Sequence, residues 1–296
     1  MVICSVVLLS FGFILQRIYQ KGTDEGVLSS IRFSIYSACF SLVILLLMNG
    51  LKLEFSWYSL INAAFRAACG FAYTVIGFWI MKRGGVALYM LFLMSGGMIL
   101  PAVWGWLLLD EAVLPLRVLG VLVILAAIFV TQLGGKRPDI KMLAACLCVF
   151  ILNGFVSVSS KLHQINETYP TVSTEAYALF GTVLSLIMSL LMLAVLRRTK
   201  GKHDLDGAPK DAGNQKRGRA SWSILIVAGY SVLGCISSLL QLWGAKSLPA
   251  SVLYPLITGG STVFGGLFAA AFLGERQSRR EWIGIALCVV GTLLFL

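Results

Sequence analysis

An arginine lies in the middle of an apolar run of this sequence, and polar residues recur around it at helical spacing. Arg66 is the tenth residue of the run 57–80, Asn62 precedes it by four positions, and Tyr73 follows it by seven. Such spacings place side chains on one face of an α-helix. A guanidinium there can bind a carboxylate or phosphate of a ligand. The alternative is a structural role in which Arg66 bonds backbone carbonyls or pairs with another helix, and the residues favour neither.

Other apolar runs carry isolated polar side chains. Tyr230 and Gln241 fall on one face of the run 221–243, Asn153 lies within 141–160, and Gln16 lies near the end of 3–19. These residues are candidates to face a common cavity. Helix packing is the competing interpretation, because small and polar residues also recur where membrane helices contact each other.

Two proline-containing runs form a further group. Met94 belongs to a row of methionines spaced four apart, and Tyr254 and Thr258 belong to a row of hydroxyls in the other run. Methionine surfaces suit varied apolar ligands, although ordinary packing explains a methionine row as well. Pro101 and Pro255 each remove a backbone hydrogen bond, which predicts a hinge or gate in these two runs. The candidate binding residues are Arg66, Asn62, Tyr73, Tyr230, Gln241, Tyr254, Thr258, Met94, Asn153 and Gln16.

The amino-acid composition indicates the solvent in which these residues lie. Hydrophobic residues make up 58% of the 296 positions, and charged residues 12%. Soluble domains carry roughly 25% charged residues. A soluble enzyme, a disordered protein and a disulfide scaffold are therefore excluded, and we expect most of the chain to lie in the lipid bilayer. The net charge of +11 comes largely from the polar loop 197–220, so it indicates topology and attraction to anionic lipid rather than nucleic-acid binding.

The pattern predicts an all-α polytopic membrane protein with ten transmembrane helices. About 20 apolar residues are needed to cross the hydrocarbon of a bilayer. We predict the first run to be such a helix rather than a cleaved signal. The ten runs are 3–19, 28–48, 57–80, 86–109, 113–133, 141–160, 173–196, 221–243, 250–273 and 280–296.

The distribution of lysine and arginine predicts the orientation of these helices. The loops that follow helices 1, 3, 5, 7 and 9 hold 18 basic residues, whereas the loops that follow helices 2, 4, 6 and 8 hold 4. The positive-inside rule places the first set in the cytoplasm, and both termini of a ten-helix chain then face outward.

An internal repeat divides the chain into two five-helix halves, 1–135 and 136–296. A shift of 164 positions places residues 79–132 over 243–296, with Trp79 on Trp243 and Glu111 on Glu275. Because each half has an odd number of helices, the second half is expected to be inverted relative to the first. We interpret Glu111 and Glu275 as helix-capping residues of the connecting turns.

Several of these motifs resemble the EamA family of the drug/metabolite transporter superfamily. The resemblance is carried by the segment 248–255, by the turn Leu273-Gly274-Glu275, by Gly284 to Gly291, and by the first-half turn Asp110-Glu111, where Asp replaces the family's Gly. It implies a secondary transporter in the cell membrane with a central cavity between the halves. Members of the family usually keep both termini in the cytoplasm, which conflicts with the count of basic residues.

Three function classes follow from these observations. The first is a secondary transporter of a small organic metabolite or drug-like solute, and the alternative is a flippase for a lipid-linked or amphipathic molecule. A membrane enzyme is disfavoured, because only two histidines occur and almost no acidic residue lies within a span. We expect no metal and no cofactor. The expected partners are the solute and the bilayer, with a homodimer through Gly284 and Cys288 as one further option.

Overall fold

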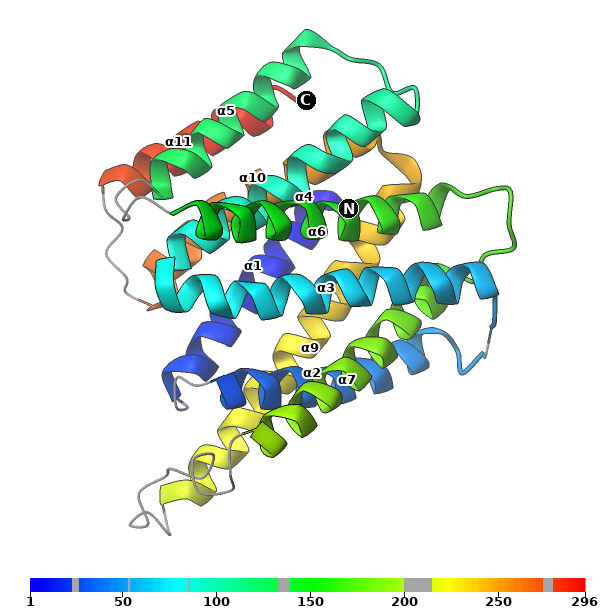
Figure 1. The fold of residues 1–296 in the computed structure, drawn as a ribbon, viewed down its shortest axis with the longest axis vertical. Helices are drawn as coiled ribbons and strands as arrows, with labels where there is room; N and C mark the ends of the chain where they lie inside the picture. The colour runs from blue at the N-terminus through cyan, green and yellow to red at the C-terminus, as the bar shows by residue number, and fades with distance from the viewer. Residues whose placement is uncertain are drawn as a thin grey trace.

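The regular secondary structure of the chain is α-helical throughout the residues that the computed structural model describes. These are residues 1–22, 27–52, 54–84, 86–132, 139–199, 215–273 and 279–295. Each predicted apolar run falls on one helix (Figure 1). The helices are α1 (Val2–Gly22), α2 (Val27–Met48), α3 (Trp57–Gly84), α4 (Val86–Leu108), α5 (Pro115–Gln132), α6 (Ile140–Ile165), α7 (Thr174–Thr199), α9 (Gln215–Ser247), α10 (Ala250–Leu273) and α11 (Arg279–Leu293).

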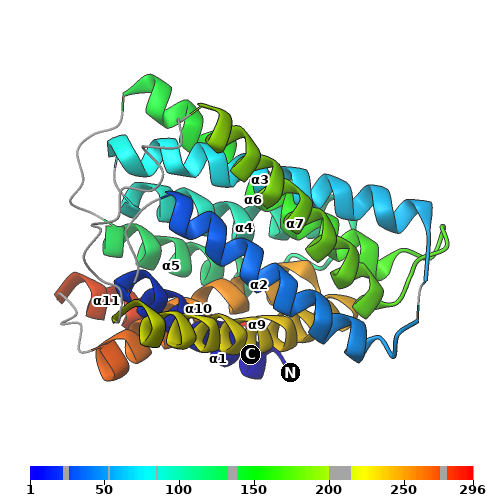
Figure 2. The ribbon, with the colours of Figure 1, turned by 90° about the horizontal axis from the view of Figure 1, so that it is seen from below.

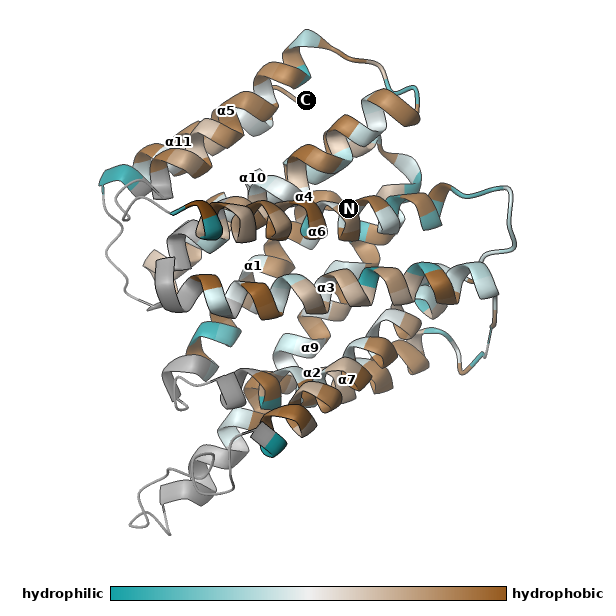
Figure 3. Ribbon diagram, in the orientation of Figure 1, coloured by the Kyte–Doolittle hydropathy of each residue, from teal (hydrophilic) through white to brown (hydrophobic). Residues whose placement is uncertain are grey.

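The length and composition of these helices suit a bilayer. Seven of the described helices, α1, α2, α3, α6, α7, α9 and α10, are long and apolar enough to cross a membrane. The other three contain shorter apolar segments, Phe92–Leu108, Pro115–Val130 and Trp282–Leu293. Large apolar side chains such as Leu47, Ile61 and Leu191 are exposed on the outside of the bundle, and apolar residues cover most helices in Figure 3. The chain is a multi-pass membrane protein. That all ten helices cross the membrane stays a prediction.

The main helix pairings are the same when the two predicted five-helix halves are exchanged. α1 packs against α9 and α10, as α6 packs against α3 and α4. α2 packs against α7, and α5 packs against α11 (Figures 1 and 2). Cys288 and Gly284 of α11 are buried, and Cys288 packs in an apolar cluster with residues of α5; a homodimer stays a prediction.

Glycines permit a close approach between the backbones of α4 and α6. A Cβ added at Gly96 of α4 would lie 2.1 Å from the backbone oxygen of Phe150 in α6. A Cβ at Gly154 of α6 would lie 3.0 Å from the backbone oxygen of Gly96. The absence of two side chains therefore lets the backbones of α4 and α6 meet.

The two ends of the bundle differ in charge. We call "basic end" the end where α1, α3, α5, α7 and α10 finish, because the connections there carry most of the lysine and arginine (left in Figure 1). The "opposite end" holds the short connections 49–56, 109–114, 166–173 and 248–249 (right in Figure 1). Residues 200–214 of the predicted polar loop, with His203, lie outside the described residues, as do Gly274 and Glu275.

Glu111 caps the first turn of α10 across the boundary between the halves. Its carboxylate accepts hydrogen bonds from the backbone N–H groups of Ala250 and Ser251, at 2.5 and 2.9 Å, and from the hydroxyl of Ser251 at 2.6 Å. A negative charge at a helix N-terminus is stabilised by the helix dipole. The predicted capping role of Glu111 is confirmed. The preceding Asp110 has a φ of 51°, which explains why the family's pattern has glycine at that position.

We expect Glu111→Gln to lower the stability of the protein by about 1–3 kcal/mol. The amide keeps the shape of the carboxylate but replaces one acceptor oxygen with an NH₂ group, so that one donor of α10 loses its partner. The measurement is the melting temperature of the purified protein in detergent. Asp110→Asn is the matched control, because asparagine tolerates the left-handed conformation and should leave the melting temperature unchanged. Equal melting of the two variants would contradict the capping role.

Candidate functional site

A cavity of about 460 Å³ lies between helices that come from both halves of the chain. α1, α2 and α3 line it from the first half, and α6, α7 and α9 from the second. Its volume falls in the range of about 300–1,000 Å³ that is typical of small-molecule sites. The lining residues of α2 lie mainly in the half of the helix that points to the basic end, and those of α7 lie in its middle part, beside α2 (Figure 2).

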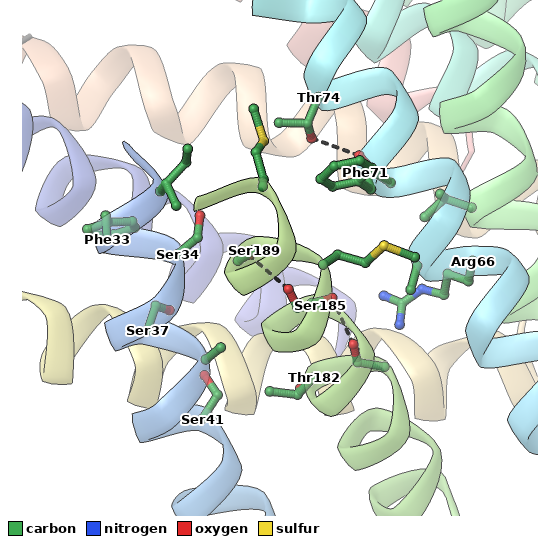
Figure 4. Close-up of a pocket in the computed structure, with 18 of the residues that line it drawn as sticks. Phe33, Ser34, Ser37, Ser41, Arg66, Phe71, Thr74, Thr182, Ser185 and Ser189 are labelled. Carbon is green, nitrogen blue, oxygen red and sulfur yellow. Dashed lines mark hydrogen bonds between the residues drawn. The ribbon is translucent and has the colours of Figure 1, made fainter. Parts of the chain in front are cut away.

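Two rows of hydroxyl groups line this cavity. Ser34, Ser37 and Ser41 follow each other at spacings of three and four residues along α2. Thr182, Ser185 and Ser189 repeat the same spacing along α7 (Figure 4). Residues so spaced share one helical face. Each helix therefore presents one polar face to the cavity.

The hydroxyls on α7 are oriented as acceptors toward the cavity. Thr182, Ser185 and Ser189 donate their hydroxyl protons to the backbone carbonyls of Ala178, Gly181 and Ser185, at 2.9, 2.7 and 2.8 Å. Thr74 of α3 donates to the carbonyl of Gly70 in the same way. A hydroxyl that has given its proton to the backbone still has lone pairs. These oxygens are therefore free to accept hydrogen bonds from a ligand.

Arg66 provides the charge of the cavity. It is the one charged side chain among the lining residues, and Figure 4 shows its guanidinium pointing from α3 toward the hydroxyl row of α7. Its Nε atom is buried and has no hydrogen-bond partner in the described part of the chain. Leaving a charged group buried without an ionic partner costs several kcal/mol. Arg66 as a whole is only partly buried and lines the cavity, so its guanidinium lies where a ligand can reach it.

Two residues of α7 fix the position of the guanidinium. The ring of Tyr177 lies under it, with 5.9 Å between the guanidinium carbon and the ring centroid, which gives a cation–π contact. A Cβ at Gly181 would lie 3.0 Å from Nη1 of Arg66. Gly181 therefore leaves room for the guanidinium to approach the α7 backbone.

A hydrogen-bonded network closes the cavity toward the opposite end. Asn62 Oδ1 accepts hydrogen bonds from the Tyr177 hydroxyl and from Ser159, both at 2.8 Å. The imidazole of His163 stacks on Tyr177, with ring centroids 3.8 Å apart, and its Nε2 lies 2.9 Å from the hydroxyl oxygen of Ser59. We call these five residues the closing network. They join α3, α6 and α7 beneath Arg66.

Further contacts hold the connections at this end. Lys161 of α6 donates hydrogen bonds to the carbonyls of Ala245 and Leu248 at the end of α9, at 2.7 and 2.6 Å. In the connection 49–56, Glu54 accepts a hydrogen bond from the backbone N–H of Ser173, which lowers the pKa of this carboxyl. The opposite end is therefore tied by polar contacts as well as by packing.

The predicted binding residues divide into two sets. Arg66, Tyr73, Tyr230 and Gln16 line the cavity. The lining does not include Asn62, Gln241, Tyr254, Thr258, Met94 or Asn153.

The second set makes contacts elsewhere in the bundle. Asn62 belongs to the closing network. Gln241 donates to the hydroxyl of Ser237 on its own helix, Tyr254 donates to the carbonyl of Ser157, and Asn153 donates to the carbonyl of Leu93. In α10, the hydroxyls of Ser261 and Thr262 both donate to the backbone carbonyl of Thr258.

The methionine row and the two prolines lie in a packed part of the bundle. Met94 packs against the apolar cluster that α4, α5, α10 and α11 form together, and Met98 is fully buried in it. Pro101 and Pro255 are also fully buried. α4 packs mainly against α6 and α10, and α10 mainly against α1 and α4, and no described lining residue of the cavity comes from either helix.

Neither hydroxyl row was among the binding residues predicted from the sequence. Their signal was present, because Ser34, Ser37 and Ser41 match Thr182, Ser185 and Ser189 at a constant shift of 148 positions. Serine and threonine are common at helix–helix contacts, so composition did not distinguish the rows from ordinary packing. Among the described residues, no group of three or more His, Cys, Asp or Glu is placed to hold a metal ion.

Known proteins resemble this chain both in sequence and in fold. A sequence model described as the EamA-like transporter family matches residues 140–296, which is more than half of the chain. One crystal structure, whose protein is given no specific description, has the same fold as this chain, with a TM-score of 0.68. The two sequences are 18% identical, and the match covers 98% of this chain and 93% of the other. No curated protein sequence matches the chain at a significant level.

Proposed function

The chain belongs to the EamA-like transporter family, within the drug/metabolite transporter superfamily, and from this we propose that it is a secondary transporter that moves a small organic solute by alternating access. The matched family confirms the resemblance noted in the sequence. The cytoplasmic membrane is the proposed location, with the basic end in the cytoplasm.

The observation that carries this proposal is the cavity around Arg66. Helices of both halves line it, and a guanidinium without an ionic partner lies within it among apolar helices. Ionisable groups inside a membrane bundle are expensive and mark substrate pathways. A purely structural bundle has no need for such a group.

The arrangement of the helices corresponds to one state of an alternating cycle. Lining residues extend toward the basic end, and the closing network and Lys161 hold the opposite end together. The main helix pairings are preserved when the two halves are exchanged, which supports an inverted repeat. In such a repeat the two halves would exchange conformations, and the cavity would then open at the opposite end. Pro101 and Pro255 remain the proposed hinges, since both lie where α4 and α10 meet.

Filling the cavity without changing its charge should stop transport. We expect Ser185→Phe to lower transport at least about tenfold, because the aromatic ring would enter the space between α2 and α7. The measurement is an untargeted comparison of metabolites in cytosol and medium of cells that express each protein at equal level. One solute class should shift across the membrane only with the wild type, which would also identify the solute.

Ile187→Phe is the matched control. It places the same aromatic ring on the same helix, but Ile187 is exposed on the outer surface and is not among the described lining residues. It should transport at the wild-type rate. If no soluble metabolite responds to the wild type and a labelled lipid crosses instead, the flippase alternative replaces this proposal. Wild-type transport by Ser185→Phe would exclude the cavity as the pathway.

A further inference from the structure

The lining of the cavity limits the charge that its ligand can carry. Arg66 is the one charged side chain among the lining residues, and the rest are hydroxyl, amide and apolar groups. In a low-dielectric cavity, one carboxylate balances one guanidinium. A dianion would leave one negative charge uncompensated, and a neutral ligand would leave Arg66 uncompensated. A zwitterion would bring an ammonium group for which the lining residues that the structure describes offer no carboxylate.

The hydroxyl rows define the remainder of the ligand. The hydroxyls of Thr74, Thr182, Ser185 and Ser189 donate to backbone carbonyls, so in this arrangement their oxygens are available to a ligand as acceptors. A ligand must therefore supply hydrogen-bond donors along its length. The row on α7 covers seven residues from Thr182 to Ser189, which is about 10 Å at the α-helical rise. An alkyl chain beside this row would desolvate its oxygens without pairing them.

On the basis of the proposed function, we propose that the cavity binds a polyhydroxy monocarboxylate. The carboxylate pairs with Arg66, and the hydroxyl groups of the ligand donate to the side-chain oxygens of α7 and α3. Tyr177 and Gly181 hold the guanidinium where the row of α7 begins, so that the charged and the hydroxylated parts of one ligand are recognised together. A sugar acid has this chemistry, since it carries one carboxylate and a hydroxyl on each remaining carbon.

Ligand-induced thermal stabilisation of the purified protein tests the two requirements separately. Gluconate is the positive probe, sorbitol lacks the charge, hexanoate lacks the hydroxyls, 6-phosphogluconate adds charge, and serine is zwitterionic. We expect gluconate to raise the melting temperature at concentrations where the other four do not. Equal stabilisation by hexanoate would overturn the role of the hydroxyl rows, and equal stabilisation by sorbitol would overturn the role of Arg66. Equal stabilisation by 6-phosphogluconate or serine would overturn the restriction to a single negative charge.

Variants of the hydroxyl row supply a second measurement. The double variant Thr182→Val, Ser185→Ala keeps the shape of the lining and removes two acceptors, so it should weaken gluconate binding about tenfold. Ile187→Ala, on the outer face of α7, should bind gluconate as the wild type does. Unchanged binding by the double variant would contradict the proposal.

Uptake into proteoliposomes separates failure of this inference from failure of the proposed function. Labelled gluconate should enter wild-type vesicles and not vesicles that contain the Arg66→Ala variant. If a different solute from a metabolite extract enters in its place, the ligand class is wrong and the transporter function stands. If no solute enters and labelled lipid crosses the bilayer, both proposals are wrong.

Discussion

Arg66→Ala is expected to abolish transport and to leave the protein folded in the membrane. The variant removes the one charge among the lining residues, and with it a charge-assisted pair to the solute. Truncating one partner of a buried charged pair costs about 2–5 kcal/mol. Affinity for an anionic solute should therefore fall at least about 30-fold. The measurement is transport into proteoliposomes with equal amounts of inserted protein.

The stability of the same variant distinguishes binding from structure. Nε of Arg66 is buried without a hydrogen-bond partner in the described part of the protein, so its removal relieves one unsatisfied buried donor. The melting temperature of the Arg66→Ala variant should therefore stay constant or rise. A structural arginine would give the reverse, because its lost contacts would lower the melting temperature together with transport.

Two further variants complete this experiment. Arg66→Lys keeps the charge and loses the planar fork of the guanidinium, so transport should be intermediate. Arg117 lies on α5, which contributes no described lining residue to the cavity. The Arg117→Ala variant should therefore transport normally. Wild-type rates in the Arg66→Ala variant would end the binding interpretation.

Gly96→Ala is expected to be the most destabilising small substitution in the bundle. The added Cβ would lie 2.1 Å from the backbone oxygen of Phe150, and no rotation of a side chain can move a backbone atom away. α4 and α6 would have to separate, which also disturbs the contact at Gly154. Overpacking of this kind costs about 3 kcal/mol. The melting temperature in detergent should fall by several degrees, and the yield of inserted protein should fall with it.

Gly265→Ala provides the comparison. Gly265 lies in α10, and a Cβ there would meet nothing within 4 Å. Since alanine favours helix more than glycine does, this variant should melt at the wild-type temperature or slightly higher. Equal melting of the Gly96→Ala variant and the wild type would mean that α4 and α6 are farther apart than the structure places them.

The two predictions depend on different levels of information. Arg66 stands out in the sequence, because a charge in the middle of an apolar run has a high energetic cost wherever the helix lies. Gly96 does not stand out among the 30 glycines of the chain. Its importance comes from one atom of another helix, Phe150 O, and no periodicity in α4 indicates which residue of α6 will face it.

Asn62 and Tyr254 show the same difference within the candidate site. Helical spacing correctly placed Asn62 on the same helix as Arg66, but the direction of its side chain is set by Tyr177 and Ser159, whose hydroxyls donate hydrogen bonds to its Oδ1. Tyr254 is a polar residue in an apolar helix, as predicted, yet its hydroxyl bonds the carbonyl of Ser157 and does not reach the cavity lining. Spacing identifies a face of a helix, and the neighbouring helices decide what this face meets.

The sequence by itself determined the helices, their order and the family. Backbone groups in lipid must be satisfied within each segment, so a long apolar run can only be helical. The tertiary structure alone decided which faces enclose the cavity. Two distant serine and threonine rows became its walls because α2 packs beside α7, whereas α4 and α10, which pack against each other and against α6 and α1, contribute no described lining residue. Such pairings depend on the summed packing of many side chains, and this sum is not contained in the periodicity of any single helix.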